Sequence, residues 1–292
     1  MRCELAAVAA RAYPCGMDSL VSTDWLEEHL GEPDLVVVDA SWHMPASGRG
    51  GRDEFRKAHI PGARFLDIDE VSDRANAAPH MLPTAAEFGR AMERLGIGRD
   101  DRIIVYDNSP TRTAARGWFM IRHFGAERVA ILDGGLQRWL AEGRPIESGE
   151  PSPRAARFEA RERSEIVTKQ ALLAGIGIPW VDARGRPRFE GSEADPRPGV
   201  APGHAPGARN LPFSSLYRED GRFRPVEELR ALFAEAGVDP VMPFVASCGS
   251  GVTANSLIFA AHLIGNDGAR LYDGSWSEWG ADPATPKVLG PA

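Results

Sequence analysis

One cysteine near the C-terminus stands in a pattern that suits nucleophilic chemistry. Cys248 ends an apolar run, and Gly249, Ser250 and Gly251 follow it in the motif CGSGVT. Small residues let successive backbone N–H groups curl around a sulfur, and a helix expected from near Val252 points its positive end the same way. Both effects favour the thiolate, which is the nucleophilic form of cysteine. We expect an exposed thiolate that mild peroxide would oxidise. An inert core cysteine is the alternative, but it needs no Gly-Ser-Gly loop.

Length and composition limit the classes of protein to consider. The chain has 292 residues, of which 43% are hydrophobic and 26% charged, and a net charge of −7. This length predicts two domains, and the acidic balance disfavours nucleic acid or an anionic membrane as a partner. The 3 cysteines cannot all pair with one another. They suit a reducing compartment, so we expect a cytoplasmic protein.

The first 16 residues differ from the rest of the chain. They contain Cys3 and Cys15, and a short apolar patch lies between Arg2 and Arg11. This pattern is weak both as a secretory signal and as a membrane anchor. We expect either that Met17 is the natural start or that residues 1–16 form a disordered extension.

The chain carries the same series of motifs twice. The first half reads LVVVDAS, AHIPGARFLDI, RIIVYDNS and LDGGLQRW, and the second reads WVDAR, GHAPGARNLPF, FVASCGS and LYDGSWSEW. Corresponding positions lie between 140 and 145 residues apart, and Asp107 of the third motif corresponds to Cys248. Four motifs in one order with near-equal offsets indicate a duplicated fold.

Each half alternates short apolar runs with helical stretches. The helices are expected at 84–95, 112–124, 226–236 and 252–264. Continuous apolar strands between helices predict an α/β fold with two domains, each a mainly parallel sheet flanked by helices. The Pro-rich, charged segment 148–164 reads as a linker. The predicted domains are therefore 17–147 and 165–292.

Two further repeated motifs read as structural. His59 and His204 each precede a Pro-Gly pair, where a histidine more often organises a turn than performs catalysis. The Asp-Gly and Trp pattern of the fourth motif is typical of a strand end, a tight turn and a packed indole. These motifs define the fold rather than the reaction.

The doubled pattern, the two His-x-Pro-Gly turns and CGSGVT resemble the tandem-domain rhodanese superfamily. Within it, the cysteine loop is similar to that of the 3-mercaptopyruvate sulfurtransferases. The likeness runs from about Val21 to Trp279. It implies that the C-terminal domain is catalytic and that the N-terminal domain carries an aspartate, Asp107, in place of the cysteine.

The resemblance also assigns roles to residues outside the loop. Arg188 and Arg197 lie in a Gly/Pro-rich stretch, and they match the family's pair of substrate arginines. An arginine fork suits a planar carboxylate. Asp69 in FLDID and His80 in HMLP match the partners of Ser250 in a proton relay. Nearby acids, Glu190 and Asp195, either pair with the arginines or face solvent.

Sulfur transfer requires a thiolate that takes a sulfur atom as a persulfide and yields it to a second nucleophile. We expect Cys248 to carry that sulfur, with N–H groups from Gly249 through Ser250, Gly251, Val252 and Thr253 stabilising the anion. The hydroxyl of Ser250 either moves a proton to the departing pyruvate enolate or only caps the loop. The reaction requires no metal or cofactor.

Three other functions compete with 3-mercaptopyruvate sulfur transfer. A thiosulfate dianion calls for basic residues directly after the cysteine, whereas Gly249 and Ser250 are neutral. A phosphatase on this fold needs a phosphate-binding arginine where the chain has Ala254. A non-catalytic sulfur-carrier module is the third alternative. The acceptor stays open among thioredoxin-like dithiols, small thiols and cyanide.

Overall fold

The computed structural model describes residues 17–292, and its strands form two parallel sheets. The five-stranded sheet of domain one has the order β1-β5-β4-β2-β3, and the four-stranded sheet of domain two has the order β7-β6-β8-β9. All strand pairs within these sheets are parallel. The predicted α/β fold class is confirmed. The N-terminal segment predicted as an extension, with Cys3 and Cys15, lies outside the described residues.

Domain one is built on the apolar runs of the first half. Its strands are β1 (Leu20–Val21), β2 (Leu35–Asp39), β3 (Arg64–Phe65), β4 (Arg102–Tyr106) and β5 (Val129–Leu132). Its helices are α1 (Thr23–His29), α2 (Gly51–Lys57), α3 (Ala85–Leu95), α4 (Ala114–His123) and α5 (Gly135–Ala141), with a short 3-10 turn, η1 (Pro45–Ser47). Alternate strand residues pack on opposite faces: Val38 and Val105 join the core under α3 and α4, and Val37 and Ile104 join the core under α1, α2 and α5. A sheet covered on both faces explains why its strands are continuously apolar.

Domain two repeats this plan with fewer strands. Its strands are β6 (Trp180–Asp182), β7 (Arg209–Asn210), β8 (Val245–Ser247) and β9 (Arg270–Leu271). Its helices are α6 (Lys169–Ala174), α7 (Arg186–Glu190), α8 (Val226–Glu235), α9 (Ala254–Ile264) and α10 (Ser275–Trp279), with a second 3-10 turn, η2 (Phe213–Leu216). Among the described residues, no helix is long and apolar enough to cross a membrane.

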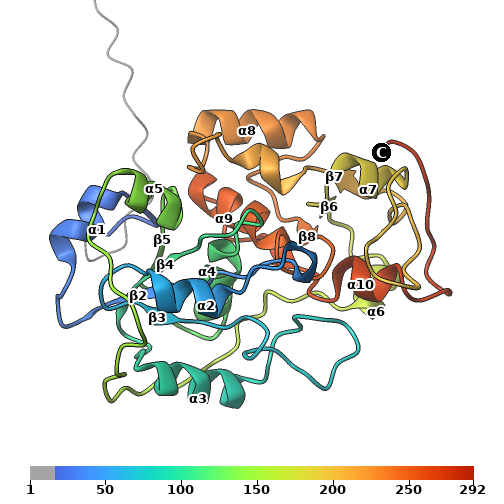
Figure 1. Cartoon of the computed structure of the whole chain (residues 1–292). Helices are drawn as coiled ribbons and strands as arrows, with labels where there is room; N and C mark the ends of the chain where they lie inside the picture. Colours follow the sequence, from blue (N-terminus) through green and yellow to red (C-terminus); the bar gives the residue numbers. More distant parts are fainter. Residues whose placement is uncertain (1–16) are drawn as a thin grey trace, which may run out of the picture.

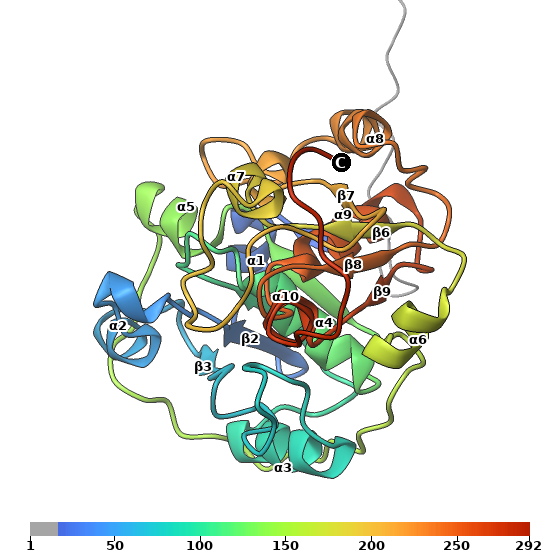
Figure 2. The ribbon, with the colours of Figure 1, turned by 90° about the vertical axis from the view of Figure 1, so that its right-hand side faces the viewer.

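The two domains share one hydrophobic core. Figure 1 shows α4 and α9 between the two sheets, and both helices contribute buried side chains to the same cluster. The ring of Trp118 on α4 meets Phe259 on α9 edge to face, with centroids 4.8 Å apart. In the view of Figure 2, α4, α9 and α10 overlap near the middle of the molecule. Because α4 and α9 each follow the third motif of their domain, their packing brings the two corresponding loops to the domain interface.

Two helices begin later than the sequence pattern predicts. α4 begins at Ala114 rather than at Arg112, and α9 begins at Ala254 rather than near Val252. Arg112 has φ of +52° and Gly251 has φ of +75°. These left-handed residues turn the chain before a right-handed helix can start. The loops after Asp107 and Cys248 are therefore longer than the pattern indicates.

The segment expected as a linker is not a free tether. The side chain of Phe158 is buried against Phe88, with ring centroids 5.6 Å apart. The backbone N–H of Arg161 also donates to the carbonyl of Phe124 at 2.9 Å. The segment thus lies along domain one before the chain enters domain two.

The histidines of the His-x-Pro-Gly turns pack in the same way in both domains. His59 stacks on Phe55 with centroids 4.1 Å apart, and His204 stacks on Phe189 at 3.8 Å. Each ring Nδ1 lies within hydrogen-bond distance of the carbonyl of the same phenylalanine, at 2.7 Å and 3.0 Å. Both side chains are buried. These contacts support the structural interpretation.

A buried aspartate ends the first motif in each domain, but its surroundings differ. Asp182 pairs with Arg184, whose Nη2 lies 2.7 Å from its Oδ2. Asp39 has Ser41 in that place, which donates a backbone N–H at 2.8 Å. Burial raises the pKa of Asp39 to about 7, against the lowering effect of the Ser41 hydrogen bonds. Domain one thus buries a carboxyl that forms no ion pair with any residue between 17 and 292.

We predict that Asp39→Asn removes a pH-dependent loss of stability. Between about pH 4 and pH 7 the unfolded Asp39 is ionised while the folded one keeps its proton, so the wild-type free energy of unfolding falls as pH rises. Asparagine does not ionise. The stability of the variant relative to wild type should therefore rise by about 1.4 kcal/mol per pH unit in this window. Urea unfolding across the window measures it, and a pH-independent difference would contradict the assignment.

Candidate active site

Cys248 lies directly after β8, at the carboxyl edge of the sheet of domain two. Its backbone N–H donates to Ser275 Oγ at 3.0 Å, and its carbonyl accepts from the Trp276 N–H at 3.0 Å. The start of α10 therefore holds the backbone of the cysteine. The residue is only 1% exposed, so the predicted exposed thiolate is wrong in that respect. The start of α10 binds the backbone of Cys248, and two arginines from the segment 188–197 pack against the next residue, Gly249, so the loop lies beneath neighbouring segments.

Most carbonyl groups of the loop that begins at Cys248 are already hydrogen-bonded within the protein. Five of them are bound by donors elsewhere, namely those of Cys248, Gly249, Gly251, Val252 and Thr253. By contrast, the backbone N–H groups of residues 249–254 donate no hydrogen bond to any residue between 17 and 292. Unpaired N–H groups in one loop favour an anion. This arrangement supports the predicted cradle.

In the corresponding loop of domain one, backbone N–H groups bind the side chain of an aspartate from the same loop. The side chain of Asp107 accepts from the Ser109 N–H at 2.8 Å and from the Ala114 N–H at 2.7 Å. Burial raises the pKa of Asp107, and these two N–H groups counteract that effect. Domain one therefore fills its own loop with a carboxyl group.

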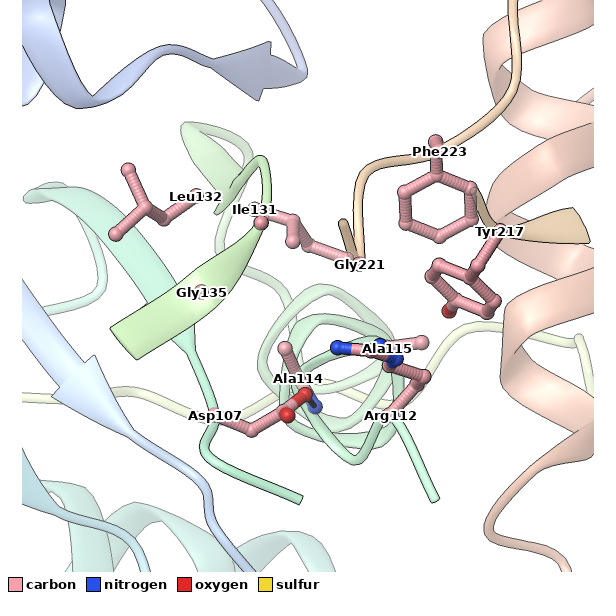
Figure 3. Close-up of a pocket in the computed structure, with 11 residues that line it drawn as sticks. Asp107, Arg112, Ala114, Ala115, Ile131, Leu132, Gly135, Tyr217, Gly221 and Phe223 are labelled. Atoms are coloured by element: carbon pink, nitrogen blue, oxygen red, sulfur yellow. Dashed lines mark hydrogen bonds between the residues drawn. The ribbon is translucent and has the colours of Figure 1, made fainter. Parts of the chain in front are cut away.

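Domain two closes over the aspartate loop. Figure 3 shows Asp107 and Arg112 beside Tyr217 and Phe223 around a small pocket. The guanidinium of Arg112 lies 5.3 Å from the ring centroid of Tyr217. The pocket encloses only about 20 Å³, which is room for about one water molecule. The loop of Asp107 is thus a contact between domains and holds no space for an organic substrate.

Arg188 and Arg197 meet at one carboxylate next to the cysteine loop. Arg188 Nη2 lies 2.6 Å from Asp195 Oδ2, and Arg197 Nε lies 2.8 Å from Asp195 Oδ1. Burial alone would raise the pKa of Asp195, but the hydrogen bonds from the two arginines lower it to about 2. Of the two acids noted near these arginines, Asp195 pairs with both, whereas Glu190 forms no ion pair with any described residue.

Both guanidinium groups lie against Gly249. A Cβ at that position would come within 3.2 Å of Arg188 Nη2 and 3.3 Å of Arg197 Nη2. Arg197 Nη1 also donates to the Gly249 carbonyl at 2.5 Å. The absence of a side chain at Gly249 therefore lets two cations approach the residue that follows the cysteine.

Ser250 faces a histidine and an aspartate from domain one. His80 Nδ1 lies 3.0 Å from Ser250 Oγ, and His80 Nε2 lies 3.0 Å from Asp69 Oδ1. The hydrogen bond with His80 lowers the pKa of Asp69, and Trp42 Nε1 donates to its other oxygen at 2.9 Å. The structure thus brings together the three residues of the predicted relay across the domain interface.

No group of histidine, cysteine or acidic residues in the described part of the chain has the geometry of a metal site. The titratable groups around Cys248 are instead engaged with one another. The arrangement supplies a buried sulfur nucleophile, a loop of unpaired N–H groups, two arginines and a hydroxyl linked to a histidine. Such a set can bind a small carboxylate and transfer a sulfur atom or an acyl group.

A comparison with protein families decides between these chemistries. The model of the rhodanese-like domain matches residues 22–142 and again residues 168–282. The chain belongs to the rhodanese family. The two matches cover both domains, so the duplicated motifs are two copies of one family fold.

Characterised rhodanese relatives align along nearly the whole chain. Human 3-mercaptopyruvate sulfurtransferase is 42% identical over 89% of this chain and 91% of its own length. The Escherichia coli K12 enzyme of that name is 40% identical over 91% of this chain and 96% of its own length. Chicken thiosulfate sulfurtransferase is 39% identical over 89% and 93%. Relatives with two different substrates are thus about equally similar.

Solved rhodanese structures agree with the fold. The crystal structure of SseA, a 3-mercaptopyruvate sulfurtransferase of Escherichia coli, has a TM-score of 0.81 at 37% identity and covers 90% of this chain and 100% of its own. Tum1 of *Saccharomyces cerevisiae* has a TM-score of 0.84 at 29% identity and covers 93% and 98%.

Several residues of this rhodanese site are not evident from local sequence. Trp42, Ser275 and the ion pair of Arg116 with Asp273 all contact the residues named above. Arg116 offers one signal, since it is a charged residue among the small and apolar residues at the start of helix α4. Asp273 belongs to the repeated Asp-Gly motif, which the sequence indicates only as a turn.

We predict that Gly251→Ala destabilises the protein more than Gly62→Ala. Both glycines have similar positive φ, +75° and +73°, so both substitutions incur about 1–2 kcal/mol of backbone strain. At Gly251 the new Cβ would also lie 2.5 Å from the Asp273 carbonyl oxygen, whereas nothing lies within 4 Å at Gly62. The clash should add about 1–3 kcal/mol. Urea unfolding measures both variants, and equal losses would refute the tight packing of the cysteine loop.

Proposed function

We propose that this rhodanese is a 3-mercaptopyruvate sulfurtransferase that carries the transferred sulfur on Cys248 as a persulfide. The observation that carries the proposal is the arginine pair beside a cysteine loop whose own residues are neutral. The loop binds the anionic sulfur through backbone N–H groups, and the arginines bind the carboxylate end of the substrate. The sequence relationship to enzymes of this name supports the same conclusion.

The net charge of the arginine site favours a monoanion. Arg188 and Arg197 contribute two positive charges, and the buried carboxylate of Asp195 cancels one of them. The remaining charge matches the single carboxylate of 3-mercaptopyruvate. Thiosulfate is a dianion and would require further positive charge near the sulfur. Gly249 and Ser250 supply none.

The transfer itself is a displacement at sulfur. The Cys248 thiolate attacks the thiol sulfur of the substrate, a new S–S bond forms, and the C–S bond breaks with its electron pair on carbon. The carbon fragment is pyruvate enolate. It takes up one proton, which the thiol of the substrate releases as the persulfide becomes an anion. The step therefore needs no external oxidant or reductant.

Ser250, His80 and Asp69 form the proposed path for that proton. The Ser250 hydroxyl donates to the enolate carbon and is reprotonated through His80, whose other nitrogen is paired with Asp69. The lowered pKa of Asp69 keeps its carboxylate ionised, so that it pairs with His80 Nε2 and orients the ring toward Ser250. General acid catalysis of this kind contributes about 10²–10⁴-fold to a rate.

A second nucleophile then removes the outer sulfur. A thiolate of a thioredoxin-like dithiol, a small thiol or cyanide attacks the persulfide, and Cys248 leaves as the thiolate. Reductant-dependent turnover suits a cytoplasmic setting, which we propose for this chain. Thiosulfate sulfur transfer is the second candidate, because relatives of that name align over most of the chain.

We predict that Cys248→Ser abolishes pyruvate release from 3-mercaptopyruvate, because serine cannot form a persulfide. Pyruvate production is measured with cyanide or a dithiol as acceptor, and mass spectrometry of the wild type without acceptor should detect one added sulfur on the peptide containing Cys248. Cys15→Ser is the matched control, since Cys15 lies outside both repeated motif sets. Full turnover by Cys248→Ser would overturn the mechanism, and a wild-type protein that releases no pyruvate from 3-mercaptopyruvate would favour the non-catalytic carrier module.

We predict that Ser250→Ala separates the two sulfur donors. Turnover of 3-mercaptopyruvate should fall about 100-fold, because the enolate loses its proton donor. Thiosulfate releases sulfite, which needs no proton on carbon, so any activity with that donor should change only a few-fold. Steady-state kinetics with both donors measure the effect. A wild-type preference for thiosulfate, or equal losses with both donors, would contradict the assignment.

A further inference from the structure

Arg116 is a buried cation that the proposed chemistry does not use. It lies on α4 in domain one, and its side chain is 0% exposed. Its ion-pair partner is Asp273, which follows β9 in domain two and has a side-chain exposure of 2%. Burying a charged pair is costly unless its geometry and hydrogen bonds are good. This pair joins the two domains directly behind the cysteine loop.

The guanidinium of Arg116 bonds to three segments at once. Its Nη1 lies 2.8 Å from Asp273 Oδ1 and 3.1 Å from the Gly251 carbonyl oxygen. Its Nη2 lies 2.5 Å from the carbonyl oxygen of His80. One side chain therefore connects the loop that carries the histidine of the relay, the cysteine loop and the end of β9.

Asp273 completes this connection from the other domain. Its second oxygen, Oδ2, accepts the backbone N–H of Leu82 at 2.7 Å. The ion pair thus holds the backbone on both sides of Met81, through the carbonyl of His80 and the N–H of Leu82. The segment 80–82 comes from domain one but is fixed against domain two.

The backbone of His80 needs such support. Its φ is +61°, a left-handed conformation that costs a residue other than glycine about 1–2 kcal/mol. In this conformation its Nδ1 lies 3.0 Å from Ser250 Oγ. Strained residues persist where their surroundings hold them in place. The bonds from Arg116 and Asp273 hold this backbone at the domain interface, and the Asp73 N–H holds the Met81 carbonyl at 2.8 Å from within domain one.

We propose that Arg116 is a positioning residue for the reaction, which acts through Asp273 and the backbone of His80 to keep the relay histidine against Ser250. The proposal rests on the proposed function, because it assumes that His80 takes part in turnover. Arg116 itself lies behind the loop and does not touch the substrate. Its bond to the Gly251 carbonyl also holds the cysteine loop at a fixed position relative to the backbone of His80.

Lysine at this position tests geometry separately from charge. Its ammonium keeps a positive charge beside Asp273, so the buried carboxylate stays neutralised. It lacks the planar fork that reaches three acceptors in fixed directions. In Arg116→Lys, kcat with 3-mercaptopyruvate should fall about 10- to 100-fold, because small misplacements of catalytic groups have effects of this size. KM should stay within about threefold, since Arg188 and Arg197 are untouched.

The deciding experiment is a double-mutant cycle between Arg116→Lys and His80→Asn. If Arg116 acts through His80, the lysine substitution should cost less than about twofold in kcat once His80 is replaced. Additive losses would overturn the proposal, and so would an unchanged kcat in either single variant. A purely structural role would lower stability in urea but leave kcat per folded molecule unchanged.

A control and a fallback keep this test decisive. Asp133→Ala removes another hydrogen bond between the domains, from the Phe223 N–H at 2.9 Å, and should leave kcat unchanged. If Arg116→Lys does not fold, the pair Arg116→Met with Asp273→Asn removes both charges together and should show the same loss of kcat. Wild-type pyruvate release is measured first, so that failure of the proposed function is distinguished from failure of this inference.

Discussion

The site depends on how the backbone of the cysteine loop is bound from outside. Donors from α10, Arg197, Arg116 and Asn255 occupy its carbonyl groups, while its N–H groups find no acceptor in the described chain. A loop in which most carbonyl groups are bound from outside, and whose N–H groups are unpaired, favours an anion at those N–H groups. In the proposed mechanism, this neutral backbone stabilises the anionic sulfur, and the loop needs no lysine or arginine of its own to bind a small monoanion.

Duplication of the fold explains why this cradle is complete in only one domain. The loop of domain one has the same place after its central strand, but Asp107 fills it with a carboxyl group and domain two packs over it. The pocket beside Asp107 thus has room for about one water molecule and not for an organic substrate. Domain one supplies other parts instead: Asp69, His80 and Arg116 all reach toward the cysteine loop of domain two. In the proposed mechanism, each copy of the fold supplies part of one site.

The two domains differ in whether their buried aspartates form ion pairs. Every buried acid next to the cysteine loop is paired with arginine: Asp195 with Arg188 and Arg197, and Asp273 with Arg116. Asp39 in domain one has no such partner, and burial raises its pKa to about 7. A paired acid holds an arginine in a fixed direction, which a binding site requires. The unpaired acid makes stability depend on pH and has no contact with the residues of the relay.

The sequence by itself determined the doubled α/β architecture, the helix-strand alternation and the place of Cys248 at the end of a strand, because apolar periodicity and short motifs are local properties. Resemblance to a family, rather than any local pattern, pointed to His80 and Asp69. Only the tertiary structure decided that Cys248 is buried, that Asp195 joins both arginines and that Arg116 connects the domains. His80 and Ser250 are separated by 170 residues. Such contacts arise when α4 packs on α9, and no local spacing encodes which distant side chains that packing brings together.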